Sequence, residues 1–229
     1  MHSTASAQPR YAAAIFDFEG TLVDFQWRLA AAEAELRGAL AGLGLRGAEF
    51  ERGNYAALWN AAADRLAPAG RLGELRAALD PIYDRWDADA LTRWSLRPGA
   101  AELLRGLAAR GVRAALVSNI GRRAIDAALG RLGIAPWLAP VVTRDDVTEL
   151  KPRAQGIARV LATWRDAQAA QVLFVGDSLA DVAAARAAAL PVAILRGGEC
   201  DEAAFAADPP EHLISRLDAL AGWLGPPTP

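Results

Sequence analysis

Residues 15–21 read Ile-Phe-Asp-Phe-Glu-Gly-Thr, an apolar run that ends in two carboxylates and a glycine. Asp17 and Glu19 are two positions apart, so on an extended strand their side chains point the same way. Gly20 lets the chain turn, and Thr21 offers a hydroxyl just beyond the turn. Such a segment is a poor core element. It can, however, hold a nucleophile and a proton-transfer group side by side in front of a metal ion.

The composition predicts a folded protein with a sizeable core. The chain has 229 residues, of which 53% are hydrophobic, enough for one large or two small domains. Its net charge of -2 gives no argument for a nucleic-acid or membrane partner. Residues 1–10 do not resemble a signal peptide, and no apolar run approaches the ~20 residues of a membrane span. The single cysteine, Cys200, excludes an internal disulfide and fits a reducing cytosol. We therefore expect a cytoplasmic protein, with monomer or homodimer left open.

Apolar, β-prone runs alternate with helical patterns along most of the chain. The runs cover 12–18, 113–119, 139–143, 172–178 and 191–196, with a short further strand at 212–214. Helical patterns cover 99–110, 121–132, 153–166 and 179–189. Near-continuous apolar strands separated by helices favour a parallel sheet covered on both faces, which is an α/β fold of the Rossmann-like type.

The first strand and the second are separated by an unusually long helical segment. From Asp24 to Leu96 the chain shows helix patterns only, with breaks near 42–47, near 68–73 and at Pro81. Some seventy residues are too many for one crossover and predict an inserted all-helical subdomain. We expect a core of residues 11–23 and 97–225, a helical cap of residues 24–96, and flexible ends at 1–10 and 226–229.

Four short polar motifs follow the predicted strands, where ligands bind in open α/β sheets. They are Asp17-x-Glu19-Gly20-Thr21, Ser118-Asn119, Lys151-Pro152 and Gly176-Asp177-Ser178-x-x-Asp181. Each motif alone is an ordinary turn or helix cap. Their joint occurrence, in order and each after a strand, indicates a single site.

The residue types suit phosphoryl transfer. Asp17 can attack phosphorus, while Glu19 can protonate the leaving group and then activate water. Asp177 adds a hard oxygen ligand for Mg²⁺, and Ser118 can donate to a phosphoryl oxygen. Lys151 supplies a compact positive charge.

Lys151 is the only lysine among the 25 basic residues of the chain. A forked guanidinium cannot simply replace a point charge at a crowded site. The one retained lysine therefore strengthens the prediction that these motifs form a functional site.

Together the motifs resemble the four signatures of the haloacid dehalogenase superfamily, in its branch with a helical cap after the first motif. The resemblance covers about residues 11–224 and implies the strand order 5-4-1-2-3 and a phosphatase that acts on a small phosphorylated metabolite with Mg²⁺. Phosphoglycolate or a sugar phosphate is the default substrate by family analogy. The roles that the resemblance implies are as follows: catalysis by Asp17, Glu19 and Lys151; phosphate binding by Thr21, Ser118, Asn119 and Lys151; metal binding by Asp17, Glu19 through its backbone carbonyl, Asp177 and Asp181.

Glu19 departs from the pattern of most phosphatases in this family, which have Asp there. The side chain is one methylene longer, and a displacement of that size can cost ~10²-fold in rate. The enolase-phosphatase branch has the same Asp-x-Glu-Gly-Thr version, so Glu is compatible with catalysis. Glu19 and Asp177 count against a dehalogenase. The absence of lysine in residues 24–96 counts against a phosphonate hydrolase. A sugar phosphomutase and a non-catalytic phosphoryl-ligand-binding protein remain open.

The inserted segment is expected to set specificity by closing over the core. Candidate polar contacts are Arg28, Arg52, Asn54, Arg93 and Arg97, although a solvated helix face is the more ordinary interpretation of each. The tryptophans at 27, 59, 86 and 94 are expected in the cap core or at its interface with the sheet domain.

Overall fold

A computed structural model describes residues 10–225, in which six parallel strands form one sheet. Their spatial order is β3-β2-β1-β4-β5-β6. The predicted order 5-4-1-2-3 is thus confirmed, and β6 extends the sheet beyond β5. Residues 1–9 and 226–229, predicted to be flexible, lie outside the described residues. The strands are β1 (Ala13–Phe16), β2 (Arg113–Val117), β3 (Val141–Val142), β4 (Val172–Gly176), β5 (Val192–Leu195) and β6 (His212–Ile214).

Strand β1 lies between β2 and β4, among the strands that the polar motifs follow. It pairs in parallel with β2 on one side and β4 on the other, and all four of its side chains are fully buried. A strand covered on both faces needs apolar residues at every position, which explains the unbroken run before Asp17. Because the strands are parallel, their polar continuations meet at one edge.

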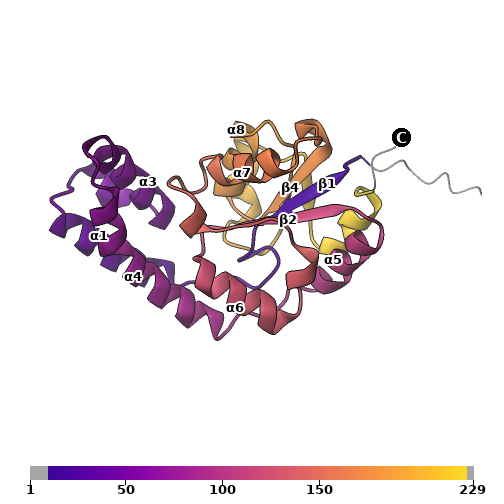
Figure 1. The fold of residues 1–229 in the computed structure, drawn as a ribbon, viewed down its shortest axis with the longest axis horizontal. Helices are drawn as coiled ribbons and strands as arrows, with labels where there is room; N and C mark the ends of the chain where they lie inside the picture. The colour runs from indigo at the N-terminus through magenta and orange to yellow at the C-terminus, as the bar shows by residue number, and fades with distance from the viewer. Residues whose placement is uncertain (1–9, 226–229) are drawn as a thin grey trace, which may run out of the picture.

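Helices cover both faces of the sheet. Helices α5 (Ala100–Ala109) and α6 (Arg122–Leu132) lie on one face, and α7 (Gln155–Thr163) and α8 (Leu179–Ala187) on the other, as Figure 1 shows. Short 3-10 helices occupy 67–69, 135–137, 144–146, 169–171, 202–206 and 217–222.

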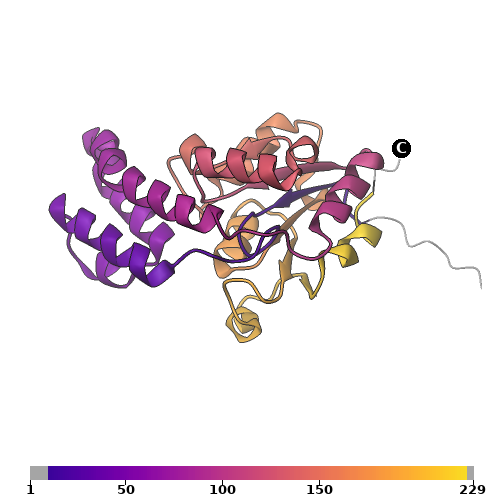
Figure 2. The same ribbon diagram turned by 90° about the horizontal axis from the view of Figure 1, so that it is seen from below.

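The inserted segment folds into helices alone and lies at one end of the molecule, beyond the sheet (Figure 2). Its helices are α1 (Leu29–Gly42), α2 (Ala48–Arg52), α3 (Tyr55–Leu66) and α4 (Leu72–Leu91). The predicted breaks near 42–47 and 68–73 separate these helices. The predicted break at Pro81 is wrong, because α4 runs through it. Burial of Leu75, Leu79 and Tyr83 along one face outweighs the backbone hydrogen bond that a proline removes.

Two linkers join the inserted helices to the sheet and pair with each other. Val23 forms an antiparallel bridge with Leu96. The amide of Asp24 donates to the Ser95 carbonyl at 3.0 Å, and the amide of Arg97 donates to the Leu22 carbonyl at 2.9 Å. The inserted segment therefore leaves and re-enters the sheet domain through one short ribbon. Within residues 10–225, none of the helices has the length and apolarity needed to cross a bilayer.

Candidate active site

A small cavity lies at the carboxyl edge of the sheet and is lined by residues of both the sheet domain and the inserted segment. Its lining comes from all four motifs and from the inserted segment. The lining residues are Asp17, Glu19, Phe25, Tyr55, Ser118, Asn119, Ile120, Lys151, Ser178, Ala180 and Glu199. The structure thus brings together side chains that are more than 180 positions apart in the sequence.

Three buried carboxylates form an acidic cluster beside the cavity, and one of them, Asp17, lines it. Asp17, Asp177 and Asp181 each offer one oxygen, and these oxygens lie within 4.8 Å of one another. The Nζ of Lys151 lies 2.6 Å from an oxygen of Asp17 and 2.6 Å from an oxygen of Asp181. Hard carboxylate oxygens at this spacing fit a divalent cation such as Mg²⁺.

Burial shifts the ionisation of this cluster. It raises the pKa of Asp17 to about 6, an effect that Lys151 only partly offsets. Burial also holds the pKa of Asp177 well above its ordinary value, with Asp181 and Asp17 adding like charge. For Lys151, burial lowers the pKa, but Asp17 and Asp181 outweigh it and the net shift is upward. Carboxylates crowded together in a buried site favour cation binding.

Asp177 is held in place from several sides. Its Oδ1 accepts from the Thr21 hydroxyl at 3.1 Å and its Oδ2 accepts from the Glu199 amide at 2.6 Å. A Cβ on Gly20 or on Gly198 would come within 2.1 Å of Oδ2, so both glycines are required by close approach. Thr21 is fully buried and is not among the lining residues, which places its hydroxyl behind Asp177 rather than in the cavity.

Asp181 organises the start of α8. Its Oδ2 accepts from the Ser178 hydroxyl at 2.8 Å and from the amides of Asp177 and Ser178 at 3.1 Å. This is a capping box, with Ser178 as the N-cap residue. Since its other oxygen contacts Lys151, Asp181 already has partners on both oxygens.

Two asparagines clamp the backbone around Lys151. Asn119 accepts from the Lys151 amide at 3.0 Å and donates to its carbonyl at 3.1 Å. Asn60, on α3 of the inserted segment, forms the same reciprocal pair with Leu150, at 2.9 Å in each direction. Asn119 also lines the cavity, where its amide lies 3.4 Å from the Tyr55 hydroxyl. The position of Lys151 therefore depends on both the sheet and the inserted helices.

Ser118 lines the cavity directly after β2. Its hydroxyl oxygen accepts from the Ile120 amide at 3.2 Å, which leaves the hydroxyl proton for another acceptor. The backbone then turns into α6, whose N-cap is Gly121.

Glu19 reaches away from the acidic cluster to both linkers. Its Oε1 accepts from the amides of Gln26 and Trp27 at 2.7 and 2.8 Å, and from Trp94 Nε1 at 2.8 Å. Burial raises the pKa of Glu19 to about 7, although these three donors oppose the shift. The longer side chain of Glu19 thus makes contacts with both linkers that could not be predicted from the sequence.

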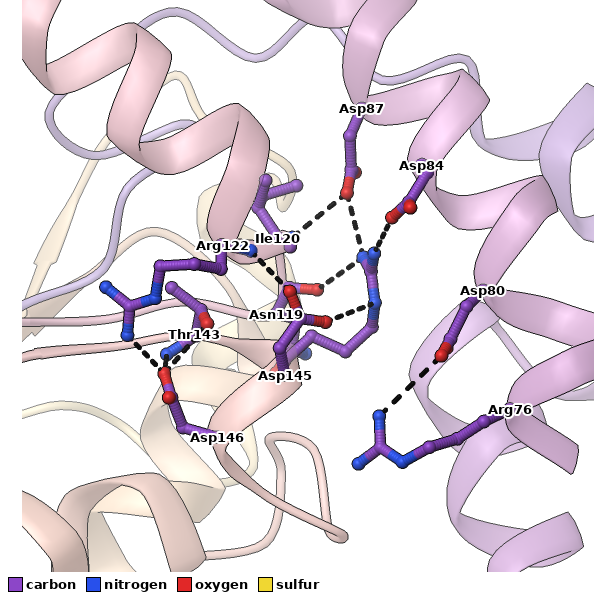
Figure 3. A network of polar contacts seen from close by, with 12 residues as sticks. Arg76, Asp80, Asp84, Asp87, Asn119, Ile120, Arg122, Thr143, Asp145 and Asp146 are labelled. Atoms are coloured by element: carbon purple, nitrogen blue, oxygen red, sulfur yellow. Dashed lines mark hydrogen bonds and ion pairs between the residues drawn. The ribbon is translucent and has the colours of Figure 1, made fainter. Parts of the chain in front are cut away.

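A buried ion-pair network fastens α4 to the loops that follow β2 and β3. Figure 3 shows Asp84 and Asp87 reaching from α4 toward these loops. The fully buried Arg144 guanidinium lies 2.8 Å from Asp87 and 2.7 Å from Asp84. Asp87 also accepts from the Gly121 amide at 3.0 Å and from Trp27 Nε1 at 3.0 Å. The network holds the inserted helices against the loop that carries Ser118 and Asn119.

The contacts of the inserted segment with the cavity differ from the candidates named from sequence. None of Arg28, Arg52, Asn54, Arg93 and Arg97 is among the lining residues. From the inserted segment, Phe25 and Tyr55 line it instead, and Glu199 lines it from the loop after β5. The signals for the latter two are weak: Tyr55 follows the N-cap Asn54 of α3, and Glu199 follows the Gly197-Gly198 turn after β5. Trp27, Trp59 and Trp94 are buried and Trp86 is half-buried, packed as expected.

This fold and this arrangement of motifs define a class of hydrolases. The sequence model of the haloacid dehalogenase-like hydrolase family matches residues 11–189. The chain belongs to this family.

Several curated relatives are named phosphoglycolate phosphatase. The chain is 35% identical over 146 residues to a plasmid-encoded phosphoglycolate phosphatase of Cupriavidus necator, and 34% identical over 172 residues to a phosphoglycolate phosphatase of Rhodospirillum rubrum. These matches cover 63% and 73% of this chain but only 63% and 66% of the relatives' own lengths. A phosphoglycolate phosphatase of Photorhabdus laumondii is 30% identical over 219 residues, covering 93% of this chain and 92% of the relative.

Solved structures share the fold. A structure described as a haloacid dehalogenase-like hydrolase from Bacteroides fragilis superimposes with a TM-score of 0.67 at 24% identity, covering 92% of this chain and 99% of that one. The HAD-hydrolase YfnB of Bacillus subtilis superimposes with a TM-score of 0.60 at 20% identity, covering 92% and 97%. The YfnB structure is described as bound to magnesium and as revealing interdomain movement.

Proposed function

We propose that this chain is a Mg²⁺-dependent phosphatase that hydrolyses a small phosphorylated metabolite through an aspartyl-phosphate on Asp17. The observation that carries the proposal is the Asp17 carboxylate, which lines the cavity beside Lys151 and within the acidic cluster. The common name of the curated relatives, phosphoglycolate phosphatase, supports phosphomonoester hydrolysis.

In the proposed reaction Asp17 attacks phosphorus and the bond to the leaving oxygen breaks. Lys151 offsets negative charge on the transferred group, and the Ser118 hydroxyl donates to a phosphoryl oxygen. Water then attacks phosphorus, releases inorganic phosphate and regenerates Asp17. Thr21 and Asn119, predicted as phosphate ligands, act here as positioning residues, because they hold Asp177 and the Lys151 backbone.

Glu19 is the proposed proton-transfer group. It protonates the leaving oxygen in the first step and takes a proton from water in the second. Its Oε1 is committed to three donors from the linkers, so we assign the proton to Oε2. Glu19 would thus both transfer the proton and contact the two linkers of the inserted helices.

Asp17, the backbone carbonyl of Glu19 and Asp177 would hold Mg²⁺, and Asp181 would support them through Lys151 and the start of α8. When bound, the ion supplies charge stabilisation for the phosphoryl oxygens. The magnesium in the structure described for YfnB supports this choice of ion. We further propose that residues 24–96 act as a cap over a core of residues 11–23 and 97–225.

The test is release of phosphate from p-nitrophenyl phosphate with Mg²⁺, comparing the wild type with Asp17→Asn. We expect at least a ~10³-fold loss in the variant. Asp166→Asn, at an exposed carboxylate paired with Arg113, is the matched control and is expected to retain activity. Activity that survives Asp17→Asn would exclude the covalent route. Inactivity of the wild type on every phosphomonoester would favour a protein that only binds its ligand.

A further inference from the structure

The cavity contains an acidic residue that the proposed mechanism does not use. Glu199 lines the cavity from the loop after β5, yet it is not a member of the acidic cluster of Asp17, Asp177 and Asp181. Its backbone amide donates to Asp177, so the residue is attached directly to the site. The proposed reaction gives its side chain no role, which leaves substrate binding as a function for it.

The loop that carries Glu199 is held firmly. The Arg97 guanidinium donates to the Arg196 carbonyl at 2.7 Å and to the Gly197 carbonyl at 2.8 Å. Gly198 packs against Asp177 at a distance that excludes a side chain. Tyr55 of α3 also lines the cavity, and the charge of Glu199 adds to the burial that raises the pKa of its phenol. Glu199 and Tyr55 thus line the same cavity, one from the sheet domain and one from the inserted helices.

The charges around the cavity are unbalanced. Asp17, Glu19 and Glu199 line it, and Lys151 is the only cationic residue that does so among residues 10–225. The charge of Lys151 is already shared between two carboxylates at 2.6 Å each. A phosphoryl group has Lys151 and the bound cation as partners, whereas a second negative charge on the substrate would face carboxylates with no cation to receive it.

We infer that Glu199 sets the substrate class, an inference that rests on the proposed phosphatase function. The site accepts phosphomonoesters whose leaving group ends in a hydroxyl or an ammonium. It disfavours phosphomonoesters whose leaving group carries a carboxylate. The curated relatives are named for phosphoglycolate, whose leaving group is a carboxylate-bearing alcohol. The substrate inferred for this chain differs from phosphoglycolate in the charge of its leaving group, which is neutral or positive. Specificity here comes from repulsion of the wrong ligand as much as from attraction of the right one.

Three two-carbon phosphomonoesters of nearly equal size provide the test. They are phosphoethanolamine, 2-hydroxyethyl phosphate and phosphoglycolate, with an ammonium, a hydroxyl and a carboxylate at the far end. We expect kcat/KM of the wild type at mildly alkaline pH to fall in that order, by about tenfold or more from first to last. A wild type that prefers phosphoglycolate overturns the inference and leaves the phosphatase proposal standing. Inactivity on all three and on p-nitrophenyl phosphate overturns both.

Glu199→Gln separates the role of this charge from a merely structural one. We expect it to raise kcat/KM for phosphoglycolate and lower it for phosphoethanolamine, so that their ratio shifts by about tenfold, while 2-hydroxyethyl phosphate changes little. Glu202→Gln, on the same loop but paired with Arg196 at the surface, is the matched control and should leave the ratio unchanged. Equal changes for all three substrates in Glu199→Gln would contradict the inference.

Discussion

Shortening Glu19 by one methylene tests why this chain has Glu where the resemblance to the family's motif leads us to expect Asp. In the structure Oε1 of Glu19 accepts from Gln26, Trp27 and Trp94 at 2.7–2.8 Å. An aspartate at this position cannot reach all three donors. The Trp94 indole is 1% exposed, so its N–H would be left without water or a protein acceptor.

The expected loss follows from these contacts. A buried donor without a partner costs about 1–3 kcal/mol, so Glu19→Asp should lower the free energy of unfolding by that amount. Displacement of the proton-transfer group should lower kcat by about 10²-fold. Urea denaturation measures the first quantity, and steady-state hydrolysis of p-nitrophenyl phosphate measures the second.

Trp94→Phe provides the matched partner for a double-mutant cycle. Phenylalanine keeps an aromatic ring against Phe18, whose ring is perpendicular to that of Trp94 at 5.0 Å, but it has no N–H. In the Glu19→Asp background the second change removes the orphaned donor, so it should cost about 1 kcal/mol less than in the wild type. Additive effects, or a Glu19→Asp variant that is faster and no less stable than the wild type, would refute the reasoning. A faster variant would instead indicate that Glu19 places the proton-transfer group less favourably than Asp does, so that the wild type is a slow phosphatase.

Two further substitutions test the supports of the site. Arg144→Met should destabilise the protein by about 3–5 kcal/mol in urea, because it leaves the Asp87 carboxylate buried without its guanidinium partner. Adding Asp87→Asn should recover part of the loss, because it removes the unpaired charge and keeps an acceptor for the Gly121 amide and the Trp27 indole; a loss below about 1 kcal/mol in Arg144→Met would contradict this. Gly198→Ala should lower Mg²⁺-dependent kcat/KM by about 10²-fold by displacing Asp177, whereas Gly106→Ala, with open space around it, should not; equal effects of the two would contradict the close approach.

Most of the fold could be predicted from the sequence, because the buried strands are apolar runs and β1, β2 and β4 each end in a polar motif. Those two features determine the sheet and bring the motifs to one edge. Pro81 is the clear exception. A local rule predicts a helix end there, but the packed face of α4 sustains the helix.

The site was less accessible to sequence analysis than the fold. The four motifs meet around the cavity as expected, yet Asn60, Tyr55 and Glu199 come from segments whose position depends on how the inserted helices pack against the sheet. The contact between Glu19 and Trp94 likewise spans 75 positions and two linkers. No local pattern encodes such distant partners, so only the tertiary structure reveals them.

We propose that Asp17 becomes covalently phosphorylated during turnover. Borohydride reduction of enzyme quenched during hydrolysis of p-nitrophenyl phosphate converts an aspartyl-phosphate to homoserine, which peptide mass spectrometry locates. We predict homoserine at position 17, formed only with Mg²⁺ and substrate and lost in Asp17→Asn. An enzyme that turns over under the same conditions without homoserine at position 17 would contradict the account.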